Sequence, residues 1–213
     1  MKNKIEELKN IDEIQSVKPK KRRFTGFRAA IVSILALTLI CGIIYPLSVT
    51  MVSQTLFPYE ANGSVIEVTL KDGSKRVYGS ELIGQEFTDG KYLLGRINLG
   101  APSNLAPNSD KFKELVKTRK EYLNSLGHND DVPTELVTSS GSGVDPHISV
   151  ETAKYQVNRI VSYRNKTLEN TSKITDKDVE KIIDKYTKGR FLGVFGEKTV
   201  NVLLVNLALD GLL

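Results

Sequence analysis

Three side chains that cooperate in many hydrolases lie close together in the sequence: the Ser142 hydroxyl, the Asp145 carboxylate and the His147 imidazole. A catalytic triad requires a serine hydrogen-bonded to a histidine, which a carboxylate orients from its other side. Pro146 stiffens the backbone between Asp145 and His147, so this geometry is difficult to reach within one short segment. The same residue types build tight turns that cap helices, and we favour that structure here.

The segment that carries these residues, SSGSGVDPHIS at residues 139–149, is the most unusual stretch of the chain. It combines hydroxyl groups with two glycines and ends where a helix is expected to start. Glycines allow a backbone to approach a partner protein or an anion closely. We therefore treat the segment as a candidate partner-contact surface, whose members are Ser140, Gly141, Ser142, Gly143, Asp145 and His147.

Sequence motifs of nucleotide-binding and hydrolytic enzymes are incomplete or absent. A phosphate-binding loop needs Lys and then Ser or Thr, but Ala101 and Pro102 occupy those positions in the stretch that begins at Gly95. No Gly-x-Gly-x-x-Gly fingerprint occurs, and Ser140 replaces the first glycine that a nucleophile elbow around Ser142 would require. One cysteine and two histidines are too few for an internal disulfide or a structural zinc cluster. The residues therefore predict neither a catalytic site nor a metal site.

Charge is distributed unevenly along the chain. Residues 1–28 contain nine of its 30 Lys or Arg and four of its 25 Asp or Glu, which leaves 21 of each sign in the remainder. The formal net charge of +5 therefore belongs to an N-terminal tail. Because a nucleic-acid-binding domain needs a basic face on its folded part, we expect no nucleic-acid partner.

No charged residue occurs between residues 29 and 59, and residues 29–49 are mostly apolar. About 20 such residues cross a bilayer, so we predict a transmembrane helix, which Pro46 should kink. A buried helix of a soluble protein is rarely free of charge over this length. A cleaved signal peptide has a shorter apolar region and a small-x-small exit, which is missing here. A lipoprotein anchor at Cys41 is disfavoured because Ile40 precedes it.

The flanks of this helix predict its orientation. Six basic residues lie between residues 18 and 28, whereas residues 49–70 contain no Lys or Arg. Cationic flanks remain in the cytoplasm, so the N-terminus should be cytoplasmic and the main domain extracytoplasmic. The predicted organisation is a basic cytoplasmic tail at 1–28, a transmembrane helix at 29–57 and an extracytoplasmic domain at 58–213.

The pattern of residues 58–213 is typical of one mixed domain. The strand-like SVIEVTL is followed by Asp72-Gly73 and KRVY, which predicts a hairpin with a tight turn. A β-prone run from Val200 to Leu204 predicts a strand near the C-terminus. The fold class is therefore a single N-terminal transmembrane helix followed by one mixed α+β (α/β-like) soluble domain.

Three amphipathic helices are expected in this domain. They begin at the hydroxyl residues Ser109, Ser149 and Thr175, each of which can accept a hydrogen bond from the first helical turn. Apolar residues then recur at helical spacing, and Gly127 is expected to end the first helix.

Several strings in order along the chain resemble the C subunit of the bacterial Kdp potassium-transporting ATPase. They run from the membrane exit to the C-terminus: Tyr45-Pro46-Leu47, Asn62-Gly63-Ser64, residues 79–87 (GSELIGQEF), Ser103-Asn104-Leu105, Val132-Pro133, Leu136-Val137-Thr138, residues 140–149, Tyr155-Gln156 with Arg159, and residues 200–210. The chain departs from the family pattern at Ile97 and at residues 100–102.

The resemblance implies a non-catalytic, single-pass subunit of an ATP-driven potassium-uptake complex in the bacterial plasma membrane. Its implied partners are a channel-like K⁺-binding A subunit, a P-type ATPase B subunit and a small F subunit, besides the lipid bilayer. The family's C subunit is described as a catalytic chaperone that raises the ATP affinity of the B subunit. The resemblance also adds Ser103 and Asn104 to the partner-contact residues.

The predicted orientation conflicts with a direct ATP contact, because ATP is inside the cell. We therefore favour an external domain that packs on the channel-like subunit, so that any ATP binding comes through the complex. If the chaperone description is literal, Gln156 is the candidate for nucleotide proximity; the simpler interpretation is an exposed polar position on a helix. A membrane-anchored hydrolase that uses Ser142 and His147 remains the alternative function, and an extracytoplasmic sensor is disfavoured because only 28 residues are left for a cytoplasmic output.

Overall fold

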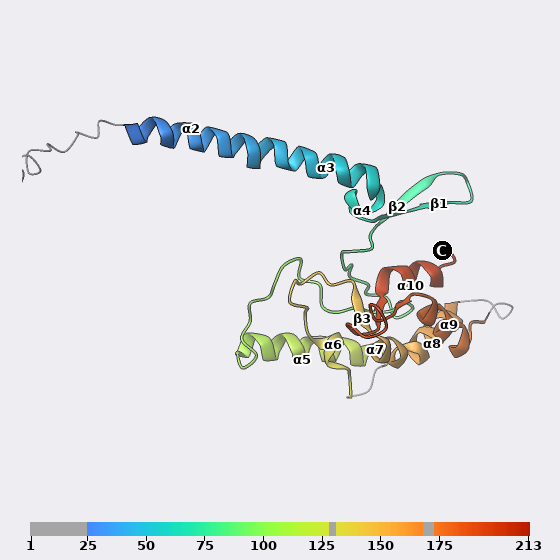
Figure 1. Cartoon of the computed structure of the whole chain (residues 1–213). Helices are drawn as coiled ribbons and strands as arrows, with labels where there is room; N and C mark the ends of the chain where they lie inside the picture. Colours follow the sequence, from blue (N-terminus) through green and yellow to red (C-terminus); the bar gives the residue numbers. More distant parts are fainter. Residues whose placement is uncertain (1–24, 128–130, 168–172) are drawn as a thin grey trace, which may run out of the picture. The chain divides into compact units, whose positions relative to one another are not determined.

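The computed structural model describes residues 25–127, 131–167 and 173–213 (Figure 1). The chain divides into two compact units, one up to Phe57 and the other from Pro58 to Leu213. The predicted basic tail lies almost entirely outside the described residues.

The described part of the first unit is one apolar helix. It consists of α2 (Thr25–Leu39), a π-helical segment η1 (Ile40–Ile44) and α3 (Tyr45–Leu56). Its 31 residues from Gly26 to Leu56 are long and apolar enough to cross a membrane, as the sequence predicts. Large apolar side chains are exposed along its length, as expected for a helix that contacts lipid or partner helices.

The backbone of this helix changes its hydrogen-bonding pattern just before Pro46. In η1, the Tyr45 N–H donates to the Ile40 carbonyl, one residue further back than in an α-helix. The proline has no N–H, and its ring crowds the carbonyl four residues earlier, at Gly42 within η1. The disturbance that the sequence predicts at Pro46 therefore takes the form of a π-helical turn.

The second unit begins with a short helix, α4 (Pro58–Ala61), and an antiparallel hairpin of β1 (Val65–Thr69) and β2 (Lys75–Ser80). The Leu70 N–H donates to the Ser74 carbonyl at 2.8 Å, which closes the tight turn. The hairpin predicted around Asp72-Gly73 is therefore confirmed. A bulge follows Ile66, whose side chain is buried against the C-terminal helix.

A three-stranded antiparallel sheet lies at the centre of the second unit. Its order is β3 (His147–Ser149), β5 (Thr199–Asn201) and β4 (Thr187–Lys188). Side chains from β3 and β5 join those of the surrounding helices in the main core, and its fully buried members include Leu93, Ile160, Ile183 and Val205.

Helices surround this sheet, and Figure 1 shows α10 separated from α5, α7 and α8 in the same unit. Their bounds are α5 (Asp110–Ser125), α6 (Thr134–Val137), α7 (Val150–Tyr155), α8 (Val157–Thr167), α9 (Asp176–Lys185) and α10 (Val202–Leu209). The helix α9 packs on both α8 and α10. The predicted mixed α+β class is confirmed.

The three predicted helix starts are confirmed by their caps. Ser109 accepts a hydrogen bond from the Phe112 N–H, Ser149 from the Thr152 N–H, and Thr175 forms a reciprocal capping box with Asp178. The helix predicted from Ser149 is nevertheless divided at Gln156 into α7 and α8.

The strand predicted over Val200–Leu204 is wrong beyond Asn201. The strand β5 ends there, because the Asn201 side chain accepts a hydrogen bond from the Leu204 N–H and caps α10. Apolar residues then face the core on almost every side of α10, so the run lacks the alternation that separates a strand from a buried helix.

Candidate functional site

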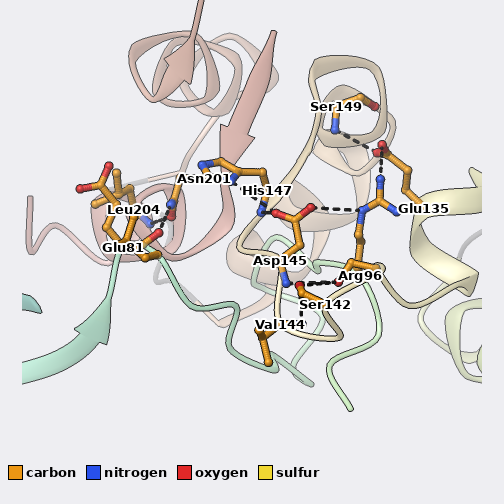
Figure 2. Close-up of polar contacts among 12 residues, drawn as sticks. Glu81, Arg96, Glu135, Ser142, Val144, Asp145, His147, Ser149, Asn201 and Leu204 are labelled. Carbon is orange, nitrogen blue, oxygen red and sulfur yellow. Dashed lines mark hydrogen bonds and ion pairs between the residues drawn. The ribbon is translucent and has the colours of Figure 1, made fainter. Parts of the chain in front are cut away.

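The segment 139–149 is closed by its own hydroxyl groups. The Ser140 Oγ accepts hydrogen bonds from the Gly143 N–H at 3.0 Å and the Asp145 N–H at 3.3 Å. The Ser142 Oγ accepts from the Val144 N–H at 3.2 Å (Figure 2). It also lies 3.3 Å from the Ser140 Oγ. These contacts are those of an ordered turn, the structure that the sequence favours.

Gly143 brings this turn against another part of its own chain. Its φ of +76° is a conformation that other residues rarely adopt, and a Cβ at this position would collide with the Ala101 carbonyl. The Leu99 N–H also donates to the Gly143 carbonyl at 3.1 Å. The close approach that this glycine permits is therefore internal, whereas Gly141 is exposed with open space around it.

The three residues of the hydrolase interpretation do not form a relay. The Asp145 Oδ1 accepts from the His147 N–H at 2.9 Å and lies 3.4 Å from the His147 Nδ1. The Ser142 Oγ instead bonds within the turn, and no hydrogen bond joins it to His147 among the described residues. Asp145 and His147 are thus brought together, and Ser142 is not placed to use the imidazole as a base.

An ion pair that the sequence motifs do not reveal holds the end of this segment. The Arg96 Nη2 donates to the Glu135 Oε1 at 3.0 Å, and the Ser149 N–H donates to the Glu135 Oε2 at 2.9 Å (Figure 2). Arg96 also lies 4.0 Å from Asp145. One carboxylate therefore connects the loop of Arg96, the helix α6 and the start of α7.

The electrostatics of Glu135 follow from these contacts. Partial burial alone would raise the pKa of Glu135, but hydrogen bonds from Ser149 and Thr152 and the positive charge of Arg96 outweigh it. The pKa of this carboxyl therefore lies below its ordinary value, and the ionised form is the one that the fold stabilises.

Two further segments hold the turn in place. The Val202 N–H donates to the Pro146 carbonyl at 3.0 Å, and the Gly84 N–H donates to the Val144 carbonyl at 2.7 Å. The Asn201 Nδ2 donates to the Glu81 carbonyl at 2.8 Å, which joins the same two segments to each other. The cavity enclosed between Gly84, Arg96 and Asp145 measures about 10 Å³ and can hold at most a water molecule.

The other two partner-contact candidates lie near this turn in the chain. Ser103 accepts a hydrogen bond from the Leu105 N–H at 3.4 Å, and Asn104 is exposed with a φ of +51°. The stretch that carries them approaches the turn through Ala101, which Gly143 contacts. Their role in partner contact stays a prediction.

Gln156 is fully buried, so the interpretation as an exposed helix position is wrong. Its Oε1 accepts from the Leu94 N–H at 2.9 Å and from the Arg159 Nη2 at 2.7 Å, and its Nε2 donates to the Leu94 and Thr152 carbonyls at 3.0 and 3.3 Å. A nucleotide would have to displace these bonds to reach the amide. The nucleotide contact of Gln156 stays a prediction.

Arg159 extends this buried polar cluster. It donates to the Gly90 carbonyl and, at 3.0 Å, to the Tyr92 carbonyl. Burial lowers the pKa of Arg159 to about 10, so the guanidinium remains charged at neutral pH. Gln156, at the junction of α7 and α8, and Arg159, in α8, thus fix the backbone of residues 90–94, a role that only the fold reveals.

These features define a class of protein: a small mixed domain joined to a helix that can cross a membrane. A hydrogen-bonded polar turn lies where a catalytic triad would have to form. Sequence comparison places the chain within that class. The model of one family, described as "KdpC: K+-transporting ATPase, c chain", matches residues 27–211. The chain therefore belongs to the KdpC family.

Individual relatives match this chain over nearly their whole length. A potassium-transporting ATPase KdpC subunit of Clostridium perfringens is 53% identical, with 87% of this chain and 97% of the relative covered. Subunits of the same name from Clostridium botulinum and Listeria welshimeri are 47% and 46% identical, with 88% and 90% of this chain and 96% and 98% of the relatives covered. The resemblance noted in the sequence is confirmed.

Proposed function

We propose that this chain is a non-catalytic accessory subunit that assembles and stabilises an ATP-driven potassium-uptake complex. Its partners would be a channel-like K⁺-binding subunit, a P-type ATPase subunit that carries the catalytic site, and a small third subunit. The observation that carries the proposal is the family match over residues 27–211. The closed turn at residues 139–149 supports it, because its hydroxyl groups are occupied by backbone contacts.

The docking surface would be the exposed side of this turn, next to Ser103 and Asn104. Gly141 offers a direct test because a side chain added there meets no atom of the chain within 4 Å. We expect Gly141→Trp to lower recovery of the channel-like subunit about tenfold after detergent purification, as blocking an interface centre does. The matched variant Glu114→Trp, on an exposed site of α5, should leave recovery unchanged. Equal recovery with both variants would exclude this surface.

The domain would lie outside the cell, as the basic flank of the helix predicts. Replacing Cys41 with Ala removes the single native thiol, after which Cys can be introduced at Ser142 or at Gly26. A membrane-impermeant thiol reagent should label the Ser142→Cys chain in intact cells and leave the Gly26→Cys chain unlabelled until lysis. The reverse pattern would place the domain in the cytoplasm and open a direct route to ATP.

The effect on ATP affinity would then be transmitted through the complex. We expect the KM for ATP of the purified pump to rise when this chain is omitted, with K⁺ binding retained. Gln156→Ala separates the two routes. A structural Gln156 predicts a lowered melting temperature of this subunit together with any change in KM, whereas direct nucleotide contact predicts a changed KM at unchanged melting temperature.

A further inference from the structure

A small hairpin near the C-terminus projects four large apolar side chains into solvent. Phe191, Leu192, Val194 and Phe195 are 72%, 76%, 71% and 65% exposed, although they lie within five consecutive residues. We call residues 191–195 the apolar tip. Single exposed apolar residues are common on proteins, but a compact group of four usually marks a surface that contacts something else.

The backbone holds these side chains in a fixed arrangement. The Phe191 N–H donates to the Phe195 carbonyl at 2.8 Å, and the Phe195 N–H donates back to the Phe191 carbonyl at 2.9 Å. Leu192 has a φ of +52°, which is unfavourable for a leucine. The tip is therefore pre-organised to present its apolar groups, and its one strained residue is the most exposed of the four.

Cationic side chains border the apolar tip on both sides. Lys188 and Arg190 precede it, and Lys198 follows it, against one carboxylate at Glu197. All four charged residues are exposed. No ion pair engages the three cations within the described part of the chain.

We propose that the apolar tip inserts into the interface of an anionic lipid bilayer, with Lys188, Arg190 and Lys198 at the level of the phosphate groups. Aromatic and aliphatic side chains enter the boundary between headgroups and acyl chains, and cations beside them gain from anionic lipid. Only Phe57 separates α4 from a helix that can cross the membrane. This tether keeps the effective lipid concentration high, so weak insertion of a short tip is sufficient.

The form of the tip favours lipid over a protein partner. A specific protein interface buries about 800 Å² on each side, spread over 20 or more residues, whereas this hairpin offers a narrow projection of five. Its border carries three cations and one carboxylate, which suits an anionic surface. The turn proposed above as the docking surface is a separate element, so the insertion does not depend on that docking.

The chain contains no tryptophan, so one introduced at the tip gives an unambiguous signal. We would reconstitute full-length Leu192→Trp into vesicles of phosphatidylglycerol and phosphatidylcholine that contain lipids brominated near the ester end of the acyl chains. We expect blue-shifted emission that the brominated lipid quenches. Leu99→Trp, at a partly exposed apolar site outside the tip, should emit as in water and remain unquenched.

Charge variants separate insertion from non-specific contact. Each of Lys188→Gln, Arg190→Gln and Lys198→Gln should lower the ratio of inserted to free tip about fivefold in phosphatidylglycerol vesicles. The same changes should have little effect in pure phosphatidylcholine. Circular dichroism of each variant would confirm that the domain remains folded.

Two outcomes would overturn the proposal. Leu192→Trp emission that matches Leu99→Trp in anionic vesicles would place the tip in water. Blue-shifted emission that appears only in the assembled pump, without quenching by brominated lipid, would assign the tip to a partner subunit. Either result leaves the test of the Gly141 surface unaffected, so failure of this proposal is distinguishable from failure of the proposed function.

Discussion

Two glycine-containing turns of the same domain adopt the same backbone angle in opposite surroundings. Gly143 and Gly193 both have a φ of +76°. A Cβ on Gly143 would collide with the Ala101 carbonyl, whereas a Cβ on Gly193 would meet no atom within 4 Å. One turn is therefore packed against its own chain, and the other is free of it, although both residues look alike in the sequence.

The two turns also differ in what their side chains contact. In residues 139–149, hydroxyl groups and Asp145 accept backbone hydrogen bonds, and Glu135 fixes the end of the segment. In the apolar tip, the hydrogen bonds join backbone to backbone, and the side chains remain exposed. The first turn stabilises the fold, and the second presents a surface outward at little benefit to the fold.

The largest effect is expected from adding one methyl group to each glycine. Gly143→Ala combines an unfavourable φ with a collision against backbone, so we expect a loss of about 3 kcal/mol in the free energy of unfolding. Gly193→Ala has the same angle and open space, so its loss should be about 1 kcal/mol. Urea unfolding of the full chain in detergent measures both. Equal losses would show that crowding at Gly143 is unimportant.

The next largest effect on stability is expected at Glu135, whose carboxylate holds the packed turn. Glu135→Gln should lower the free energy of unfolding at neutral pH by about 1 kcal/mol, because the charge-assisted bond to Arg96 is lost. The pKa of Glu135 is lowered in the folded protein, so its contribution to stability is present above the ordinary glutamate pKa of 4.5 and is lost as the pH falls through the folded pKa.

The free energies of unfolding of wild type and Glu135→Gln should therefore converge below about pH 4.5. Unfolding at a series of pH values measures this. Glu114→Gln, on an exposed position of α5, is the matched control and should follow the wild type at every pH. A difference that stays constant down to pH 3 would assign the effect to shape and not to charge.

Short sequence patterns predict the helix starts and turns that are stabilised by contacts between neighbouring residues. The caps at Ser109, Ser149 and Thr175 and the turn at Asp72-Gly73 each depend on residues within one turn of chain, and all four are confirmed. The apolar first helix is also recognisable because composition alone defines it.

Features that depend on distant contacts could not be predicted in this way. Gln156 is hydrogen-bonded to Leu94, 62 positions away, and no local pattern distinguishes it from an exposed polar residue. Arg96 and Glu135 likewise pair across 39 positions. The strand prediction for Val200–Leu204 fails beyond Asn201 because β propensity ignores the Asn201 cap and the burial on almost every side of α10, which decide the structure.

A smaller effect is expected at the apolar tip. Phe191→Ser with Phe195→Ser should change the free energy of unfolding by less than about 0.5 kcal/mol, because both rings are mostly exposed in the folded domain. Thermal unfolding of the full chain in detergent measures this. A loss comparable with that of Gly143→Ala would mean that the tip supports the fold, and the contrast between the two turns would then fail.

A similarly small effect on stability, but of opposite sign, is expected from Leu192→Asn. Asparagine tolerates a positive φ better than leucine, so the substitution should raise the free energy of unfolding by about 0.5 kcal/mol. The same change removes the most exposed apolar side chain of the tip, so it should weaken lipid insertion, measured with a reporter tryptophan at Val194. A more stable domain with weaker insertion is the result expected if the leucine is retained for a surface role at a cost in stability. Unchanged insertion would mean that Leu192 is not the anchoring residue, and a loss of stability would mean that its conformation is supported by contacts within the hairpin.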